Sequence, residues 1–502
     1  MSTKKNKNES ILPTKIVEQT VSEAPNIIFI MADDQGYWAM GNAGNSEIKT
    51  PNLDRIAAEG MRFDNFFCVS PVCSPARASI LTGRIPSQHG IHDWICGGNT
   101  TKEHEPDGKG ELIEYLQGQP GYTDFLAEAG YVCGLSGKWH LGDAHHAQKG
   151  FKYWEAHAKG GGNYYNAPII KNGKVLQESR YITDVITNNA LKFLNNQKGG
   201  DAPFYLSVHY TAPHSPWGRD QHPYELYDDY DNSCPFNSVP DSLKAPDWVK
   251  YRSIPVDDTV TRRSHLSGYY AAVTAMDCGV GSILDWLDIN DLLENTLICF
   301  TSDNGMNMGH HGLFGKGNAS FPLNMFEESV RVPFLMSQPG TVPKGKVENA
   351  LLSHYDVMPT LLDCAGLKNP EAESLPGRSF ESLLRNEGGD GHERLVVYDE
   401  YGPVRMVRTK DWKYVHRYPY GIFELYDLKN DPGETENRID DPGCRVKIKE
   451  LKGELDDWFG RYVDPMLDGS HESVSGSGQY GLTGPARKGE PAFSDKYLKR
   501  FR

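Results

Sequence analysis

The chain has 502 residues and a formal net charge of −15, with 38% hydrophobic and 11% aromatic residues. This length exceeds one compact core, so we expect a large domain with at least one smaller appendage. The acidic balance argues against nucleic acid or an anionic membrane surface as a partner. A local basic pocket can still hold an anionic small molecule, because salt screens distant charges. The nine scattered cysteines predict reduced thiols rather than a disulfide framework.

The first apolar run, residues 27–31, is too short for a membrane span or a signal-peptide core and is interpreted as a strand. Residues 1–24 before it are polar, and we expect them to be disordered. No stretch of the sequence is apolar for long enough to span a membrane. We expect a cytoplasmic protein on the sequence as given, with a periplasmic or secreted protein as the alternative if a native leader is missing.

Polar clusters follow four of the predicted strands at the point where each strand ends. They are Asp33-Asp34 after 25–31, Lys138 and His140 after 131–135, His214 after 203–210, and Asp303-Asn304 after 296–300. Helical patterns alternate with these strands, which predicts an α/β fold with a large mixed, mostly parallel sheet sandwiched by helices. Because the carboxyl ends of parallel strands meet at one edge, we expect the clusters to converge on one crevice.

Four of these side chains offer oxygen atoms to a cation. An Asp-Asp pair alone is usually a solvated turn, but behind a buried strand the two carboxylates are costly unless they are paired or bind a cation. The donors suit a hard divalent ion, with calcium preferred to magnesium: Asp33, Asp34, Asp303 and Asn304. No Cys/His set of zinc spacing stands beside them.

A short helix is predicted over residues 76–81, with Pro75 in its first turn and Gly83 at its end. Cys73 then lies at the helix N-terminus, where free N–H groups and the dipole favour an anion. Arg77 is one turn further on and can direct its guanidinium to the same place. A single cysteine at a helix start is most often a small buried hydrophobe, so this residue alone does not define a site.

Two later regions of the chain differ from the first part in composition and in predicted secondary structure. Residues 218–262 are rich in Asp, Pro and Tyr, and we expect a long surface insertion. Past residue 385 alternating, aromatic-rich strands and a charged helix predict a small antiparallel sheet with a helix packed on it. We therefore expect a main domain over 25–385, an α+β subdomain over 386–465 and a Gly/Ser-rich tail over 466–502, loosely wrapped or disordered.

The segment Cys73-Ser74-Pro75-Ala76-Arg77, followed by Thr82-Gly83-Arg84, resembles the C-x-P-x-R and T-G-R signature of the type I sulfatases of the alkaline phosphatase superfamily. Further blocks similar to this family occur in the family's order and reach from residue 25 to 465. They are 25–36, 137–142, 212–214, 303–305, 316–317, 398–400 and 424–437. The resemblance implies an alkaline phosphatase-like sheet with a smaller C-terminal subdomain, and a sulfatase catalytic domain over 25–385.

The resemblance also implies a mechanism. In this family the cysteine, here Cys73, is oxidised to formylglycine by a formylglycine-generating or anaerobic sulfatase-maturating enzyme. Its hydrate, bound to calcium with Asp33, Asp34, Asp303 and Asn304, attacks sulfur, and its second hydroxyl then expels sulfate. The implied roles are sulfate binding by Arg77, Lys138 and Lys316, protonation of the leaving alcohol by His214 or Lys316, and base catalysis by His140.

Two further segments, 309–312 and 326–333, resemble the carbohydrate-sulfatase branch and imply a sulfated saccharide as substrate. His311 is then expected to contact a sugar hydroxyl or carboxylate. We also expect a sugar-binding wall from side chains near the matched blocks, although buried aromatic rings are the ordinary alternative. These side chains are His92, Asp93, Trp94 and Trp217. The sequence leaves the oligomeric state open.

Three rival interpretations stay open at this stage. A phosphonate monoester or phosphodiester hydrolase of the same superfamily can carry the same C-x-P-x-R motif. A catalytically silent homologue would bind sulfated glycans and release nothing. A cysteine hydrolase would use an unmodified thiol at position 73 and lose activity on alkylation.

Overall fold

The computed structural model describes residues 24–100, 111–241, 243–399, 404–418, 421–472, 478–487 and 489–493. Of the segment 1–24 only Ala24 falls in these ranges, so its expected disorder lies outside the described residues. All nine cysteines lie within these ranges and are free thiols, as predicted. Within the same ranges, no helix has the length and apolar character to cross a bilayer.

A ten-stranded mixed sheet forms the main layer, in the order β15-β2-β14-β10-β1-β8-β4-β5-β6-β7. Its centre is parallel: β10 (Thr296–Ser302), β1 (Asn26–Ala32), β8 (Phe204–His209) and β4 (Val132–Lys138). One flank holds β14 (Phe334–Ser337), β2 (Met61–Phe63) and β15 (Lys346–Glu348), and the other holds β5 (Phe151–His157), β6 (Ala167–Lys171) and β7 (Lys174–Glu178). All seven residues of β1 are buried, as expected for a strand covered on both faces.

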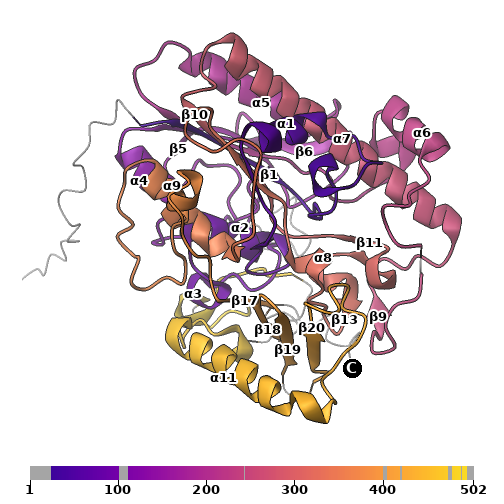
Figure 1. The fold of residues 1–502 in the computed structure, drawn as a ribbon. Helices are drawn as coiled ribbons and strands as arrows, with labels where there is room; N and C mark the ends of the chain where they lie inside the picture. Colours follow the sequence, from indigo (N-terminus) through magenta and orange to yellow (C-terminus); the bar gives the residue numbers. More distant parts are fainter. Residues whose placement is uncertain are drawn as a thin grey trace, which may run out of the picture.

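Successive side chains of β1 enter two different cores. Ile28 and Ile30 pack with α1 (Pro51–Glu59), α5 (Ile182–Gln197) and α7 (Thr259–Ile289). Ile27 and Phe29 pack with α2 (Cys73–Thr82), α4 (Tyr122–Glu128) and α9 (Val357–Cys364). Figure 1 shows these two helical layers on opposite sides of the sheet. Because successive side chains of a strand point to opposite faces of the sheet, one continuous apolar run packs against both helical layers.

A separate four-stranded antiparallel sheet forms the lower part of the molecule in Figure 1. It consists of β17 (Arg394–Asp399), β18 (Val404–Thr409), β19 (Trp412–Arg417) and β20 (Glu424–Asp427), with α11 (Arg445–Tyr462) packed on β18 and β19. The predicted fold class is therefore confirmed. The boundaries at 385/386 and 465/466 stay predictions.

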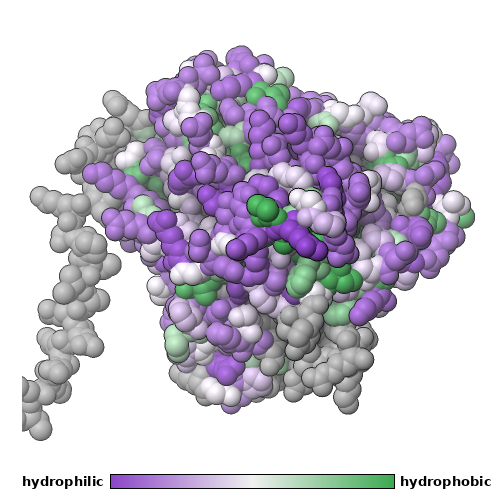
Figure 2. Space-filling model, turned by 60° about the horizontal axis from the view of Figure 1, so that its bottom comes forward, coloured by the Kyte–Doolittle hydropathy of each residue, from purple (hydrophilic) through white to green (hydrophobic). Residues whose placement is uncertain are grey.

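Short elements complete the chain around these layers. The two-stranded ladders join β3 (Phe66–Phe67) to β16 (Leu352–Ser353), β11 (Asn307–Met308) to β12 (Phe314–Gly315), and β13 (Ser320–Phe321) to β9 (Tyr251–Arg252). The short helices are α3 (Pro86–His89), α6 (Tyr224–Ser233), α8 (Glu327–Val330) and α10 (Glu381–Leu384). On the face seen in Figure 2, hydrophobic residues form only small separate patches among hydrophilic ones.

Two irregular segments are better packed than their sequence pattern indicates. The predicted surface insertion over residues 218–262 contains α6 and buries Tyr227, Tyr230 and Phe236 in a core shared with α7. The tail is also packed in part: Gln479 is fully buried and forms isolated bridges with Ile95 and Phe493. Both segments lack the regular periodicity of a long helix or strand, so the sequence pattern did not reveal their burial.

Candidate active site

The carboxyl ends of β1 and β10 bring the four predicted oxygen donors together. Asp34 has a φ of 67°, a left-handed conformation that costs about 1–3 kcal/mol outside glycine and is common at functional sites. Its backbone N–H donates to Asp303 Oδ1 at 3.2 Å, and Asn304 Nδ2 donates to Asp34 Oδ1 at 2.8 Å. Asp33 and Asp303 are fully buried. The two strand ends therefore form one polar cluster, as predicted from parallel topology.

Helix α2 begins at Cys73 and brings this residue to the cluster. Gly83, with a φ of 66°, ends the helix as the sequence predicts, and it donates its N–H to the Ser79 carbonyl at 2.9 Å. Cys73 Sγ lies 3.6 Å from Asp33 Oδ1 and 2.7 Å from Lys316 Nζ. The structure thus places side chain 73 beside the carboxylates that end β1.

Each of the three aspartates in the cluster is paired with one buried basic side chain. Lys138 Nζ, on the last residue of β4, donates to Asp33 Oδ2 at 2.7 Å. Lys316 Nζ donates to Asp34 Oδ1 at 2.6 Å, and Arg77 Nε donates to Asp303 Oδ2 at 2.9 Å. The protein's own charges therefore balance at this point. Addition of a divalent cation would leave a positive excess, which favours an anionic substrate.

Burial and these ion pairs set the protonation of the cluster. Burial raises the pKa of Asp33 against the pull of Lys138. Burial alone would raise the pKa of Asp34 too, but Lys316 holds it below its usual value. Burial also raises the pKa of the Cys73 thiol to about 12, despite Lys138 and Lys316 nearby. An unmodified Cys73 is therefore protonated at neutral pH and a poor nucleophile, which disfavours the cysteine-hydrolase interpretation.

The cluster has the chemistry of a hard-cation site. Single ligand atoms of Asp33, Asp34 and Cys73 all lie within 4.8 Å of one another. Asn304 Oδ1 is buried and has no hydrogen-bond partner among the described residues. Orphaned buried oxygen atoms are costly unless something binds them, and oxygen donors suit calcium or magnesium. The residues present therefore fit a divalent metal ion.

Two histidines approach the same place from different loops. His140 Nε2 lies 2.8 Å from the Ile95 carbonyl and therefore donates to it, while Nδ1 is buried without a hydrogen-bond partner among the described residues. Burial lowers the pKa of His140 well below its ordinary value, so the ring is neutral. His214 Nδ1 donates to the Ser215 carbonyl at 2.7 Å, and its Nε2 lies 3.7 Å from Asp34 Oδ2.

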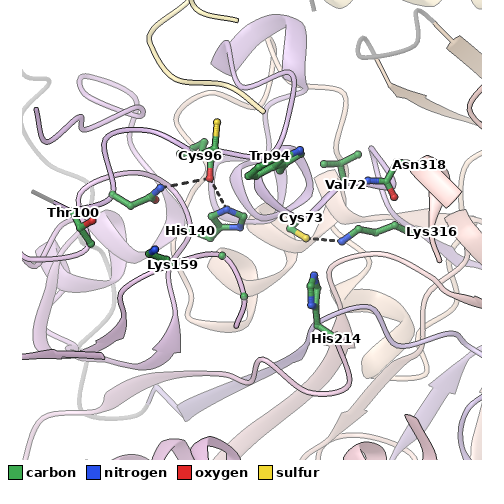
Figure 3. A pocket seen from close by; sticks show the side chains of 14 residues that line it. Val72, Cys73, Trp94, Cys96, Thr100, His140, Lys159, His214, Lys316 and Asn318 are labelled. Atoms are coloured by element: carbon green, nitrogen blue, oxygen red, sulfur yellow. Dashed lines mark hydrogen bonds between the residues drawn. The ribbon is translucent and has the colours of Figure 1, made fainter. Parts of the chain in front are cut away.

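A cavity of about 360 Å³ opens over Cys73 (Figure 3). Its walls include four predicted site residues besides Cys73, namely Trp94, His140, His214 and Lys316, and Trp94 is 36% exposed. The sequence interpretation missed the other lining side chains, which are Val72, Ile95, Cys96, Asn99, Thr100, Lys159 and Asn318. Of these, Asn318 closely follows the matched 316–317 block, and Val72 and Ile95 are direct neighbours of Cys73 and Trp94, so these three had a nearby signal in the sequence.

Four expected substrate contacts do not line this cavity. Trp217 is 4% exposed and buried in the core beside α7, with Nε1 donating to the Pro213 carbonyl at 2.8 Å. His92 is also buried, and His311 stacks on Phe326 with ring centroids 3.7 Å apart. Asp93 is fully buried as well, so the sugar-binding wall predicted from His92, Asp93, Trp94 and Trp217 is reduced to Trp94.

Comparison with known families agrees with this geometry. The sulfatase family profile matches residues 25–367, and a profile described as the C-terminal part of N-sulphoglucosamine sulphohydrolase matches residues 309–459. The chain therefore belongs to the sulfatase family, and its enzyme class is that of the sulfuric ester hydrolases.

Individual relatives cover most of the chain. An N-acetylglucosamine-6-O-sulfatase of Bacteroides thetaiotaomicron is 30% identical and the match spans 88% of each chain. An ulvan-active sulfatase of Formosa agariphila is 30% identical over 88% of this chain and 82% of its own. A solved structure in complex with its substrate D-glucosamine-2-N,6-O-disulfate is 28% identical, with a TM-score of 0.73, covering 89% of this chain and 100% of that one. The predicted family, enzyme class and fold are thus confirmed.

Proposed function

We propose that this sulfatase removes sulfate from a sulfated saccharide and that 6-O-sulfated hexosamines are the first substrates to test. The observation that carries the proposal is Cys73 beside Asp33 and Lys316 at the base of a cavity whose rim presents the Trp94 ring. Exposed aromatic faces are suited to packing on sugar rings. Relatives named for N-acetylglucosamine-6-O-sulfate and ulvan support a saccharide rather than a small aryl ester.

The proposal includes a bound calcium ion and a modified Cys73. Asp33, Asp34, Asp303 and Asn304 would hold the cation, and when bound it supplies charge stabilisation to the transferring sulfate group. A maturing enzyme would oxidise Cys73 to formylglycine. The modification would give position 73 the nucleophile that sulfate transfer requires, whereas burial raises the pKa of the unmodified thiol to about 12.

Three side chains are placed to bind the sulfate group. Lys316 Nζ touches both position 73 and Asp34, so it lies beside the attacking atom. Although burial alone would lower the pKa of Lys316, Asp34 raises it well above its usual value, which keeps the amine charged. Arg77 Nη2 is buried without a hydrogen-bond partner among the described residues, and it is a donor that a sulfate oxygen would satisfy. Lys138 adds positive charge behind Asp33.

Proton transfers then fall to the histidines and Lys316. His214 or Lys316 donates a proton to the leaving sugar oxygen, because both line the cavity next to Cys73. His140 is the base: with Nε2 donating to Ile95, its Nδ1 carries a free lone pair. Water enters in the overall reaction, which yields the free sugar hydroxyl and inorganic sulfate.

The test combines peptide mass spectrometry across Cys73 with turnover of three substrate types by the matured, calcium-loaded protein. We expect formylglycine at position 73 and sulfate release from a 6-O-sulfated hexosamine at a higher kcat/KM than from an aryl sulfate. A preference for an aryl phosphodiester would make the protein a phosphodiester hydrolase. Binding of sulfated glycans without release of sulfate would make it a catalytically silent homologue.

A cytoplasmic location stays part of the proposal, and cell fractionation would test it.

A further inference from the structure

The described part of the C-terminal tail is bound to the loop that precedes the cavity wall. Gln479 is fully buried. Its Oε1 accepts from the His92 N–H at 2.9 Å, and its Nε2 donates to the Gly90 carbonyl at 3.0 Å. Its backbone N–H donates to the Trp94 carbonyl at 2.8 Å, and its carbonyl accepts from the Cys96 N–H at 3.0 Å. One tail residue thus bonds the loop 90–96 at four points.

The tail and the loop approach too closely for side chains at two positions. A Cβ at Gly97 would lie 2.8 Å from the Tyr480 carbonyl oxygen. A Cβ at Gly478 would lie 2.4 Å from Cys96 Sγ and 3.1 Å from Cζ2 of Trp94, and Gly478 has a φ of +98°. Both glycines are therefore required by contact. The backbone of the tail forms the surface on which the Trp94 ring and Cys96 rest.

The loop transmits this contact to the reacting groups. Trp94, Ile95 and Cys96 line the cavity over Cys73. Both backbone polar groups of Ile95 are bonded, because its N–H donates to Ser74 Oγ at 3.0 Å and its carbonyl accepts from His140 Nε2 at 2.8 Å. Ser74 is the neighbour of Cys73 in α2. Displacement of Ile95 would thus disturb the nucleophile helix and the orientation of His140 together.

We propose that two residues of the C-terminal tail belong to the active site: Gln479 is a positioning residue that acts through Ile95 on His140, and Gly478 is a specificity-determining residue that sets the place of Trp94 and Cys96. The tail lies more than 380 residues from the loop in sequence, so the contact between them is a tertiary contact rather than a local turn. The assignment of His140 as base and of the cavity to a saccharide rests on the proposed function, whereas the tail–loop contact does not.

The first experiment compares Gln479→Ala with Thr483→Val in the full-length matured protein. Thr483 is on the same tail and donates Oγ1 to the Gly90 carbonyl at 2.7 Å, but it does not line the cavity. In Gln479→Ala we expect amide exchange in a peptide over 89–97 to rise about tenfold and kcat to fall about 10- to 100-fold. In Thr483→Val we expect kcat within about twofold of the unsubstituted protein.

Gly478→Ala tests the specificity role separately. The added methyl group would lie 2.4 Å from Cys96 Sγ and 3.1 Å from Trp94 Cζ2, so both side chains must shift at the cavity wall. We therefore expect KM for a sulfated saccharide to rise about tenfold while kcat for a small aryl sulfate is retained. An equal loss on both substrates that follows the unfolded fraction would reduce the tail to a structural element and overturn the proposal. So would normal exchange and normal kcat in Gln479→Ala. If the unsubstituted protein cleaves no sulfate ester, the proposed function fails, and the exchange data still decide whether Gln479 holds the loop.

Discussion

Two lysines are fully buried in the described part of the chain, and they have different roles. Lys138 at the end of β4 donates to Asp33 and belongs to the cluster beneath the cavity. Lys413 in β19 lies 2.8 Å from Glu327 Oε1 and 2.6 Å from Glu434 Oε1, and it also donates to the Met325 carbonyl at 2.9 Å. Burial alone would lower the pKa of Lys413, but the two carboxylates raise it.

The surroundings explain the difference. Around Lys138, Arg77 Nη2 and Asn304 Oδ1 are buried without hydrogen-bond partners among the described residues, and Cys73 and Lys316 open to the cavity. The Lys413 cluster lines no part of that cavity and instead joins α8 to the C-terminal sheet, with Arg408 also paired to Glu327 at 3.2 Å. Buried charge alone therefore does not mark an active site. What distinguishes the two clusters is that the one around Lys138 lies beside the cavity, through Cys73 and Lys316.

The largest effect is expected at Cys73. Cys73→Ala removes the position of the nucleophile, so we expect kcat for sulfate release to fall about 10⁴-fold or more. The melting temperature should change little, because the side chain is small and the substitution suits a helix. Retention of more than a few per cent of activity, measured by released sulfate, would remove residue 73 from the reaction.

Metal removal is expected to come next. Chelation followed by desalting leaves three carboxylates and Asn304 without their cation, so we expect activity to fall about 10²-fold or more. Calcium should restore it better than magnesium, and zinc should not restore it, because the donors are oxygen atoms. Full activity of the chelated protein, with metal content checked by elemental analysis, would contradict the metal site.

Lys413→Met tests the structural cluster. The substitution leaves Glu327 and Glu434 buried with one cation fewer, so we expect the free energy of unfolding to fall by about 3–5 kcal/mol. The kcat of the folded fraction should be unchanged at a temperature below the transition. Urea unfolding followed by fluorescence gives the first quantity, and initial rates give the second.

Lys138→Met is the matched change beneath the cavity. We expect kcat to fall about 10²- to 10³-fold, as for loss of one group that stabilises transition-state charge. If Lys138→Met and Lys413→Met changed kcat equally, the distinction between the two clusters would be lost.

The smallest effect concerns pH. Burial lowers the pKa of His222 to about 4, although the Pro216 carbonyl accepts a hydrogen bond from the ring. The unfolded chain then binds a proton near pH 6.5 that the folded chain binds only near pH 4, so stability is full above pH 6.5 and falls as pH drops through this window. In His222→Gln, the free energy of unfolding should decrease less between pH 6.5 and pH 4 than in the unsubstituted protein. The difference should be at most about 3 kcal/mol. Thermal unfolding across pH 4–7 measures it.

Much of the site was predictable because it sits where parallel strands end. Asp33, Asp34, Asp303 and Asn304 follow apolar runs that can only be central strands, and topology then brings them together. The roles of Cys73 and its neighbours came from resemblance, since composition and spacing do not encode a modification.

The cavity walls were harder to predict. Trp217 and His92 lie near matched blocks in sequence, yet both are buried, because proximity along the chain does not say which way a side chain points. Gln479 reaches the site across hundreds of residues from a segment without periodicity, so no local pattern indicated it. Contacts of that kind are fixed by tertiary packing alone.

The most direct test of the account is the dependence of activity on the fraction of chains that carry formylglycine at position 73. Preparations matured to different extents are quantified by intact-peptide mass spectrometry, and sulfate released from a 6-O-sulfated hexosamine is measured in each with calcium present. Activity plotted against this fraction should give a straight line through the origin. Activity that is independent of this fraction would contradict the role of formylglycine.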